Sequence, residues 1–419
     1  MPINFDILII GGGAAGFFTA INAAELNPQL KIAILERGKE VLTKVRISGG
    51  GRCNVTHAEF IPRELSKNYP RGEKELLGPF HSFMTGDTID WFEKRGVNLK
   101  IEDDGRMFPV TDSSQTIIDC FLSETKRLGI EVLLNHSVQE IVKENAFWKM
   151  ETTQGTFQAK NLVIATGSNP KIWKVLESLG HTIVPPVPSL FTFNIKDNRI
   201  TDLPGVSRQV SLKVLKNSSP LRGGVPMNRD EGGLESEGPL LITHWGLSGP
   251  AVLKLSAWGA RELNKLDYKF TLEVNWLEHL TFDETLEQLK VIKNYNAKQL
   301  VTKHPQFELP KRLWQNLTTA CGINPEMKWG ETNKNQLQNL SNQLTQCRFE
   351  VNGKSTFKEE FVTAGGVELK EIKFKTFESK VNKNLYLAGE VLNIDAITGG
   401  FNFQNCWTGG FLIAKAISG

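Results

Sequence analysis

The sequence predicts an α/β protein in which a Rossmann-like domain is made from both ends of the chain and a second region is inserted between them. Three patterns predict this fold class. An apolar run at 5–10 leads into a glycine-rich turn and a helical pattern, and a similar strand–glycine–helix pattern closes the chain at 384–418. Between them, residues 190–216 alternate apolar and polar side chains, as antiparallel strands do, and residues 281–346 show the spacing of helices.

Length and composition limit the class of protein. A chain of 419 residues exceeds one compact domain and is expected to form two or three. Its 40% hydrophobic and 23% charged residues exclude a disordered, coiled-coil or collagen-like chain. The 49 basic and 46 acidic side chains leave a net charge of +3, which gives no sign of a polyanionic partner, so no nucleic acid is expected.

Neither a metal site nor a disulfide framework is predicted. The cysteines are far apart and form no CxxC pair, which is typical of reduced thiols in a cytosolic protein. They are Cys53, Cys120, Cys321, Cys347 and Cys406. The uncharged stretch 7–24 is interrupted by glycines, whereas a membrane span needs a continuous apolar helix. We therefore expect a soluble, cytoplasmic protein with no membrane partner.

The N-terminal pattern predicts a dinucleotide site. The strand at 5–10 meets GGGAAG, in which Gly11, Gly13 and Gly16 fit the GxGxxG motif. The first glycine permits a tight turn, the second lets backbone approach a pyrophosphate, and the third lets the next helix pack close. The pyrophosphate would lie at the N-terminus of that helix, where free N–H groups and the dipole favour an anion. A second strand ends at Glu36, which would accept hydrogen bonds from the adenosine ribose.

Three later segments favour FAD as the dinucleotide. The first, KVRISGGGRCNVTH at 44–57, is expected to be a loop whose backbone can lie against a flat or anionic ligand. The second is LVIATGS at 162–168, which ends a predicted three-stranded meander at 147–151, 156–159 and 161–165. The third starts with the strand LYLAGE and continues into a helix that opens at 399–400. The N-terminus of this helix suits the negative charge of a reduced flavin near N1 and O2.

These segments supply the predicted cofactor-binding residues, to which Val138 is added. The whole predicted set is Gly11, Gly13, Ala14, Ala15, Gly16, Glu36, Arg37, Lys44, Ser48, Gly49, Gly50, Gly51, Arg52, Cys53, Asn54, Val138, Ala165, Thr166, Gly167, Gly389, Glu390, Asp395, Gly400, Phe401 and Asn402.

Segments spread over nearly the whole chain resemble one family. They are DILIIGGGAAG, SGGGRCNVT, DGRMFP, LVIATG, THWGLSGPAVL and AGEVLNIDAITGGFNFQ. In these segments the chain is similar to the YhiN-type, BaiN-like flavoprotein family of bacteria, also described as aminoacetone oxidase family FAD-binding enzymes. The sequence departs from the family pattern at Asn393, where Asp is expected, at Ala396, where Gly is expected, and at Cys406, where a small or apolar residue is common. If Asn393 stands at a position that contacts the flavin ribityl chain, Asp395 takes that contact instead.

The resemblance implies a discontinuous FAD-binding domain of the two-dinucleotide-fold type at 1–190 and 355–419. A β-barrel-like insert is expected at 191–275 and about 347–354, with a helical cap at 276–346. The glycine- and proline-rich stretch 217–239 is expected to be a loop.

The catalytic groups stay open at the level of sequence. No second GxGxxG follows a strand, so no dedicated NAD(P) domain is predicted. His244 or Lys44 could donate a proton, because a hydride passed to one carbon of a double bond needs a proton on the other. His57 and Arg52 are alternatives, and Arg52 could stabilise a flavin anion or a substrate carboxylate. Cys53 has no close partner cysteine and is not expected to be a redox centre.

The predicted function is that of an FAD-dependent oxidoreductase. From the family resemblance we expect reduction of an activated C=C or C=O bond in a small molecule, with electrons from NAD(P)H. An amine or aminoketone oxidase that uses oxygen is one alternative, an FAD-dependent RNA-modifying protein is a second, and a non-catalytic FAD-stabilised interaction protein is a third. Substrate, electron donor and oligomeric state are left open.

Overall fold

The computed structural model describes residues 2–215, 233–355 and 362–419. The chain divides into two compact units: unit 1 is residues 1–189 and 358–419, and unit 2 is residues 190–357. Unit 1 therefore contains both ends of the chain. Residues 217–232 of the expected loop lie outside the described residues, and a strand begins at Glu235. Among the described helices, none combines the length and the apolar character that a membrane crossing requires.

The core of unit 1 is a mixed sheet whose inner strands are parallel and include β1 (Ile3–Ile10). β1 pairs in parallel with β2 (Ile32–Leu35) on one side and with β9 (Gly155–Ile164) on the other. The sheet continues outward to β6 (Glu131–Leu133) beyond β2 and to β21 (Leu385–Leu387) beyond β9. The carboxyl half of β1 and all of β2 are buried, as expected for parallel strands that are covered on both faces.

The strands before β9 differ from the predicted meander. β9 is one unbroken strand where two short ones were predicted, because residues 157–164 pair along β1. β8 (Phe147–Thr152) pairs antiparallel with β9, and β7 (Val138–Glu144) is the third strand of the meander. β7 reads VQEIVKE and buries only Ile141, so a search for apolar runs misses it.

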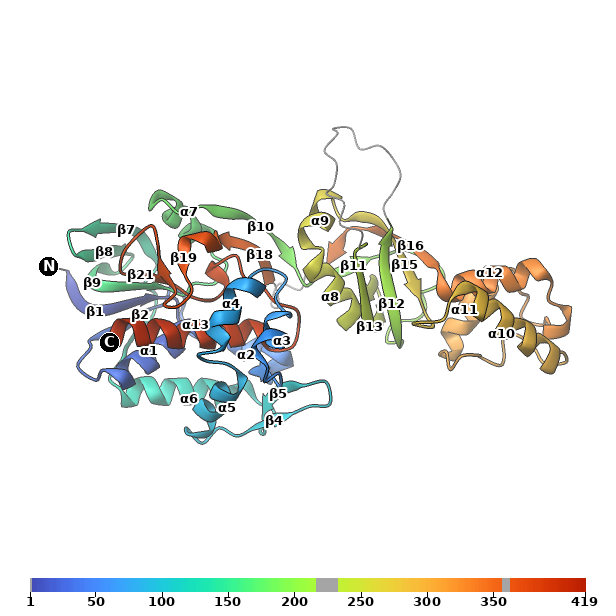
Figure 1. The fold of residues 1–419 in the computed structure, drawn as a ribbon, viewed down its shortest axis with the longest axis horizontal. Helices are drawn as coiled ribbons and strands as arrows, with labels where there is room; N and C mark the ends of the chain where they lie inside the picture. Colours follow the sequence, from blue (N-terminus) through green and yellow to red (C-terminus); the bar gives the residue numbers. More distant parts are fainter. Residues whose placement is uncertain (1, 216–232, 356–361) are drawn as a thin grey trace. The chain divides into compact units, whose positions relative to one another are not determined.

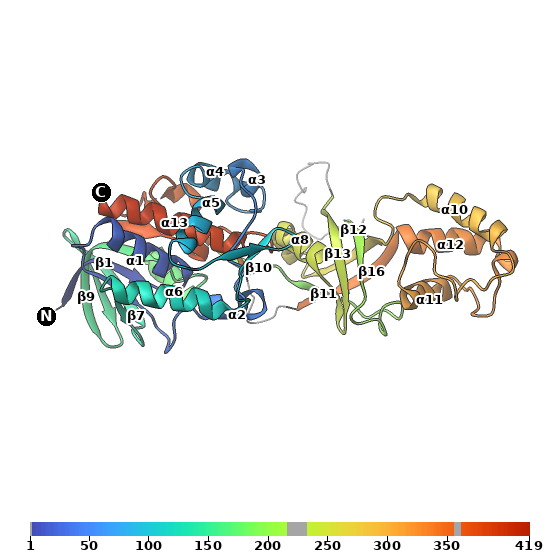
Figure 2. The same cartoon turned by 90° about the horizontal axis from the view of Figure 1, so that it is seen from below.

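Two helices from opposite ends of the chain lie side by side in unit 1: α1 (Ala14–Leu26) and α13 (Phe401–Ser418) (Figure 1). Gly410 makes this close approach possible, since a Cβ there would lie 3.3 Å from the Ala15 carbonyl oxygen. α6 (Ser114–Arg127) packs against α1 as well (Figure 2). Fully buried aromatic rings fill the space among these helices; they are Phe17, Phe18, Phe92, Phe121 and Trp407.

The remaining elements of unit 1 are short. They are α2 (Thr43–Gly51), β3 (Thr56–His57), α3 (Pro62–Ser66), α4 (Glu73–Phe80), α5 (Thr85–Glu93), β4 (Leu99–Ile101), β5 (Arg106–Pro109), α7 (Pro170–Ser178), β10 (Ile183–Ser189), β18 (Val362–Val367), η2 (Leu369–Glu371), β19 (Ile372–Lys373), β20 (Glu378–Ser379) and η3 (Gly389–Val391). The expected loop at 44–57 thus begins as the helix α2, whose backbone leaves helical geometry at 48–50.

Unit 2 contains a seven-stranded antiparallel sheet in the order β16-β15-β12-β13-β14-β11-β17. The strands are β11 (Thr192–Asn194), β12 (Ser207–Leu215), β13 (Glu235–Thr243), β14 (Gly246–Ser248), β15 (Lys269–Asn275), β16 (Cys347–Asn352) and β17 (Lys354–Ser355). Buried and exposed residues alternate along β16, which places one face on a core. Among the described strands this order is open, and no pairing closes it into a barrel; the barrel stays a prediction.

Helices complete unit 2. α8 (Pro250–Trp258) and α9 (Ala260–Lys265) follow β14. Between β15 and β16 lie α10 (Phe282–Tyr295), α11 (Lys311–Ala320), η1 (Trp329–Glu331) and α12 (Lys334–Thr345). The helical spacing predicted for 281–346 is confirmed by α10, α11 and α12.

Candidate functional site

The turn between β1 and α1 has the geometry of a dinucleotide-binding turn. Gly11 has φ +114°, and a Cβ there would lie 2.4 Å from the Ala165 carbonyl oxygen. A Cβ at Gly16 would lie 2.1 Å from the Gly11 carbonyl oxygen, so the helix can pack this close only with glycine. The Phe17 N–H donates to the Gly13 carbonyl (3.1 Å), and the three N–H groups before it, on residues 14–16, have no intrahelical acceptor. They form the positive end of α1.

Glu36 stands at the carboxyl end of β2, beside this turn. Its Oε2 accepts the Gly12 N–H at 2.9 Å and its Oε1 accepts the Gly38 N–H at 2.7 Å. Each carboxylate oxygen has a second lone pair, so the group retains capacity for two hydroxyl donors.

A pocket of about 110 Å³ adjoins Glu36. Its lining is Ile10, Gly11, Leu35, Glu36, Arg37, His136, Ser137, Val138, Thr166, Asn169, Lys171 and Ile172. Five of these are in the predicted set, namely Gly11, Glu36, Arg37, Val138 and Thr166. The prediction omitted His136, Ser137, Asn169 and Lys171. The sequence contained a signal for Asn169 and Lys171, because Asn169–Pro170 is a helix-start pattern directly after a buried strand. In the structure Asn169 caps α7 by accepting the Lys171 N–H.

Lys44, Gly167 and Glu390 meet near the N-terminus of α1. Lys44 Nζ lies 2.5 Å from Glu390 Oε2, and a Cβ at Gly167 would lie 3.6 Å from that oxygen. Burial lowers the pKa of Lys44, but the Glu390 carboxylate raises it, and the net shift is upward. Lys44 is therefore a fixed cation and a poor proton donor at neutral pH. Cys406, which was not in the predicted set, also lies here, since its Sγ is 3.2 Å from the position of a Cβ on Gly389.

The glycine segment at the end of α2 forms an open surface. Gly49, Gly50 and Gly51 all have positive φ, and a Cβ on Gly50 or Gly51 would meet nothing within 4 Å. Cys53, also at positive φ, is buried beneath this segment. The open side of the glycines leaves their backbone accessible to a ligand.

Asn54 joins this segment to the N-terminus of α13. In the amide orientation that satisfies both of its ends, Asn54 accepts the Gly400 N–H at 3.0 Å and donates to the Thr56 carbonyl at 3.0 Å. Gly400 has φ +91°, and a Cβ there would lie 2.6 Å from the Thr56 carbonyl oxygen. The first intrahelical bond runs from the Gln404 N–H to the Gly400 carbonyl. The N–H groups of residues 401–403 are thus a second free helix start in the same unit.

Side chains around this helix start hold it in place. Asn402 Oδ1 accepts the Ala396 N–H at 3.0 Å, and the Tyr69 hydroxyl donates to the Phe401 carbonyl at 2.6 Å. The Phe401 ring stacks on His57 with 4.6 Å between ring centres. Both Phe401 and Asn402 therefore shape the loop before α13.

Asp395 is buried and its carboxylate is already engaged. Arg71 donates to both carboxylate oxygens, and the Ser189 hydroxyl donates to Oδ2 at 2.7 Å. Burial raises the pKa of Asp395, and the Arg71 guanidinium opposes that rise. This arrangement makes Asp395 a residue that positions the loop 393–400. Arg71, over 300 positions away in sequence, was not predicted.

The candidate catalytic residues Arg52 and His244 belong to different units. The Arg52 guanidinium lies 2.5 Å from Glu102 and 3.5 Å from Asp112, and it stacks on the Phe108 ring at 3.9 Å. It is thus committed to a structural cluster. His244 is exposed on the turn between β13 and β14 in unit 2, whereas every predicted cofactor-binding residue lies in unit 1.

Four of the cysteines are buried and Cys406 is half-buried. Burial raises the pKa of Cys53, Cys120, Cys321 and Cys406 to about 12 and that of Cys347 to about 11. Because the thiolate is the nucleophile, we expect the native protein to resist iodoacetamide at pH 8, while the same protein in urea is labelled at all five positions. Intact-protein mass measures both. Rapid labelling of Cys53 or Cys406 in the native state would instead indicate an activated thiol beside the cofactor segments.

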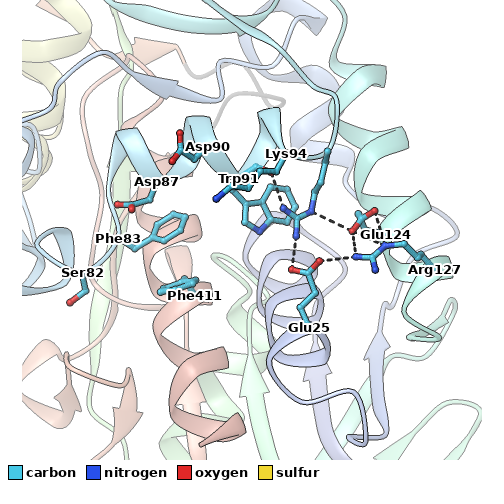
Figure 3. A pocket seen from close by; sticks show the side chains of 11 residues that line it. Glu25, Ser82, Phe83, Asp87, Asp90, Trp91, Lys94, Glu124, Arg127 and Phe411 are labelled. Atoms are coloured by element: carbon cyan, nitrogen blue, oxygen red, sulfur yellow. Dashed lines mark hydrogen bonds and ion pairs between the residues drawn. The ribbon is translucent and has the colours of Figure 1, made fainter.

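A larger pocket of about 570 Å³ lies at the other end of α1 (Figure 3). Glu25 near the C-terminus of α1 forms ion pairs with Arg95 (2.5 Å) and Arg127 (2.7 Å), and Arg95 stacks on the Trp91 ring at 3.7 Å. None of the predicted cofactor-binding residues lines this pocket.

The residues of unit 1 fit an extended dinucleotide. The start of α1, the adjacent carboxylate of Glu36 and a small pocket suit a nucleoside diphosphate. The start of α13 and the open glycine segment suit a second ring system that carries negative charge. At positions 11, 16 and 400 an added Cβ would collide with backbone, so glycine allows these segments to lie close together.

Comparison with known proteins identifies a family and several similar proteins. The model of the family described as "HI0933-like protein Rossmann domain" matches residues 5–416. A "Ribosomal RNA dihydrouridine synthase" of Haemophilus influenzae is 29% identical over 426 residues, covering 98% of this chain and 98% of its own. A "3-dehydro-bile acid delta(4,6)-reductase" of Clostridium scindens is 25% identical, covering 97% of this chain and 98% of its own. Among solved structures, a 3-ketosteroid delta1-dehydrogenase from Sterolibacterium denitrificans superposes with a TM-score of 0.51 at 9% identity, covering 99% of each chain, which is a likeness of fold.

Proposed function

The chain belongs to the HI0933-like protein Rossmann domain family, and from that premise we propose that this flavoprotein oxidoreductase uses electrons from NAD(P)H to reduce a carbon–carbon double bond conjugated to a carbonyl group. The observation that carries the cofactor assignment is the pair of helix starts, α1 and α13, in one unit with Glu36. Electrons must come from outside the chain, and the sequence contains no second GxGxxG for a resident nicotinamide dinucleotide.

FAD is assigned to unit 1 residue by residue. The N–H groups of residues 14–16 bind the pyrophosphate, Glu36 accepts from the adenosine ribose, and the adjoining pocket holds the adenine. The free N–H groups of residues 401–403 stabilise negative charge on the flavin ring. FAD, when bound, supplies the redox carrier between NAD(P)H and substrate.

Other side chains of unit 1 position these groups. Asn54 fixes Gly400 through a hydrogen bond, and Arg71 with Asp395 fixes the preceding loop. The Lys44–Glu390 ion pair places one cation and one anion beside Gly167. A Cβ on Gly50 or Gly51 would meet no protein atom within 4 Å. The glycines 49–51 therefore leave room for the planar flavin ring.

The names of the relatives support the reaction class. Dihydrouridine is uridine with hydrogen added across C5=C6, a bond conjugated to the C4 carbonyl. A delta(4,6)-reductase of a 3-dehydro steroid likewise saturates bonds conjugated to a carbonyl. The shared chemistry is addition of a hydride to one carbon and a proton to the next: C=C + NAD(P)H + H⁺ gives CH–CH + NAD(P)⁺.

Of the two substrate classes, we assign uridine in RNA to this chain. The relative named for ribosomal RNA is the more similar of the two, at 29% against 25%. The expectation of no nucleic-acid partner rested on the net charge of the whole chain, which averages over two units. A small 4-en-3-one substrate is the second candidate, favoured by the full-length match to the bile acid reductase.

An anaerobic half-reaction experiment tests this function. Holoenzyme is mixed with NADH or NADPH, and the loss of oxidised-flavin absorbance is followed. The reduced protein is then offered ribosomal RNA transcribed in vitro, a steroid 4-en-3-one, or air. We expect reduction by a pyridine nucleotide, reoxidation by the RNA, and a nucleoside digest that contains a uridine heavier by two hydrogens.

Each other outcome has a distinct meaning. Reoxidation by the enone alone selects the second candidate. Reduction by an amine and reoxidation by air alone would make the protein an oxidase, and a flavin that no donor reduces would leave a non-catalytic binding protein. Mixing oxidised holoenzyme with RNA in the absence of a donor is the control, and it should yield no modified nucleoside.

A further inference from the structure

The net charge of the whole chain hides a basic segment in unit 2. From residue 290 to residue 325, Glu308 is the only acidic residue. The basic residues of this segment are Lys290, Lys293, Lys298, Lys303, Lys311 and Arg312. A local excess of this kind attracts a polyanion even when the chain as a whole is close to neutral.

The fold adds a further lysine to this segment. Residues 297–301 run antiparallel to 327–330, with hydrogen bonds from the Gly330 N–H to the Ala297 carbonyl (2.9 Å) and from the Val301 N–H to the Met327 carbonyl (3.0 Å). Leu300 pairs with Lys328 in this ladder. Lys328 is thereby held beside the stretch that carries Lys298 and Lys303.

The three lysines are exposed. Within the described part of the chain, no ion pair involves the ammonium of Lys298, Lys303 or Lys328. Lys290, by contrast, is paired with Glu287 at 2.7 Å. Two acidic residues, Glu326 and Glu331, lie in the same loop. The Glu331 carboxylate accepts the backbone N–H of Lys328 at 2.9 Å, which holds the carboxylate on the loop backbone.

An exposed aromatic ring precedes two of these lysines in the chain. Tyr295, the last residue of α10, is 87% exposed, although large rings are normally half-buried or more. It directly precedes the stretch 296–303 that carries two of the lysines. An exposed ring among unpaired lysines is the combination by which proteins bind single-stranded nucleic acid, because bases stack on the ring and phosphates pair with the amines.

We propose that Tyr295, Lys298, Lys303 and Lys328 form an RNA-contacting surface, the tyrosine–lysine surface, in which a base stacks on Tyr295 and the lysines bind phosphates. This inference rests on the proposed function for the identity of the polyanion. It assigns RNA anchoring to unit 2, apart from the residues of unit 1 that are assigned to the cofactor.

Binding of a labelled RNA to the holoenzyme tests the surface. The probe is a fluorescein-labelled single-stranded oligouridylate, and its anisotropy is measured over a series of salt concentrations. A K298Q/K303Q/K328Q variant is expected to lower the slope of log affinity against log salt by about 2, since each phosphate contact with a single strand contributes about 0.7. Tyr295→Ala is expected to weaken binding by about 5- to 100-fold with little change in slope.

Matched controls separate this surface from general charge and hydrophobicity. Val291→Ala removes a 53% exposed apolar side chain one turn earlier on α10 and should leave RNA affinity unchanged. A K126Q/K174Q/K370Q variant removes the same charge from exposed positions of unit 1 and should lower the slope by much less. Retained flavin absorbance and circular dichroism show that each variant is folded.

The outcomes distinguish this inference from the proposed function. A wild-type holoenzyme that binds RNA through these residues but forms no dihydrouridine contradicts the proposed function alone. If the tyrosine variant and the lysine variant both still bind RNA and form dihydrouridine, the proposal of the tyrosine–lysine surface is wrong. The proposed function is then unaffected. A wild-type holoenzyme with no affinity for the oligouridylate also overturns the tyrosine–lysine surface.

Discussion

A Gly13→Val variant is expected to fold and to lose FAD affinity by about 100-fold or more. Gly13 caps α1 with ordinary extended backbone (φ −101°, ψ −170°), and a Cβ there would meet nothing within 4 Å. The valine side chain therefore enters the space at the start of α1 that is assigned to the pyrophosphate. As a helix cap it should cost about 1 kcal/mol of apoprotein stability. Flavin retained after dialysis and a fluorescence titration of the apoprotein measure the loss.

Two other glycine variants make this result specific. Gly86→Val, in α5, also places a side chain in empty space, and it should retain the flavin. Gly11→Ala should lower apoprotein stability as well as affinity, because its Cβ would lie 2.4 Å from the Ala165 carbonyl oxygen and its φ is +114°. Wild-type flavin affinity in Gly13→Val would place the pyrophosphate elsewhere.

Replacing Asp395 by alanine is expected to destabilise unit 1 by about 3–5 kcal/mol. The change leaves the Arg71 guanidinium, whose side chain is 13% exposed, without its carboxylate partner. It also removes the acceptor of the Ser189 hydroxyl. Thermal unfolding measures the effect on the whole protein. Hydrogen exchange followed by peptide mass should show that the variant speeds exchange in 393–404 more than in α10, each relative to the wild type.

A double replacement separates the loss of a contact from the cost of a buried charge that has lost its carboxylate. Arg71→Met combined with Asp395→Leu removes both charges and fills the site with apolar side chains, so this protein should be more stable than Asp395→Ala. If Asp395→Ala unfolds within about 0.5 kcal/mol of the wild type, the buried ion pair does not stabilise unit 1, and the loop 393–400 is held by its other contacts.

The parts of the site that depend on consecutive residues could be predicted from the sequence. The close backbone approaches at Gly11 and Gly16 are what the glycine spacing predicts, because the turn and the helix start are local. The helix predicted to open at 399–400 is likewise found, since α13 begins at Phe401. The assignment of Glu36 to the adenosine ribose stays a prediction.

The rest depends on contacts that no local pattern encodes. Arg71 meets Asp395, and Cys406 meets Gly389, only in the folded chain, because the partners are far apart or on different elements. β7 buries only Ile141 and carries no apolar run to detect. The basic segment of unit 2 was available in the sequence, but a net charge summed over 419 residues conceals a local excess.

The way unit 1 is divided along the chain has a consequence for biosynthesis. A nascent polypeptide that has just released residue 384 from the ribosome has made β1, β2, β9 and all of unit 2, but β21 and α13 are still missing. Until residues 385–419 emerge, the edge of β9 and one side of α1 face water, and the second helix start does not exist. Unit 2 can complete its own core during that delay, whereas the proposed cofactor can bind only after α13 has emerged.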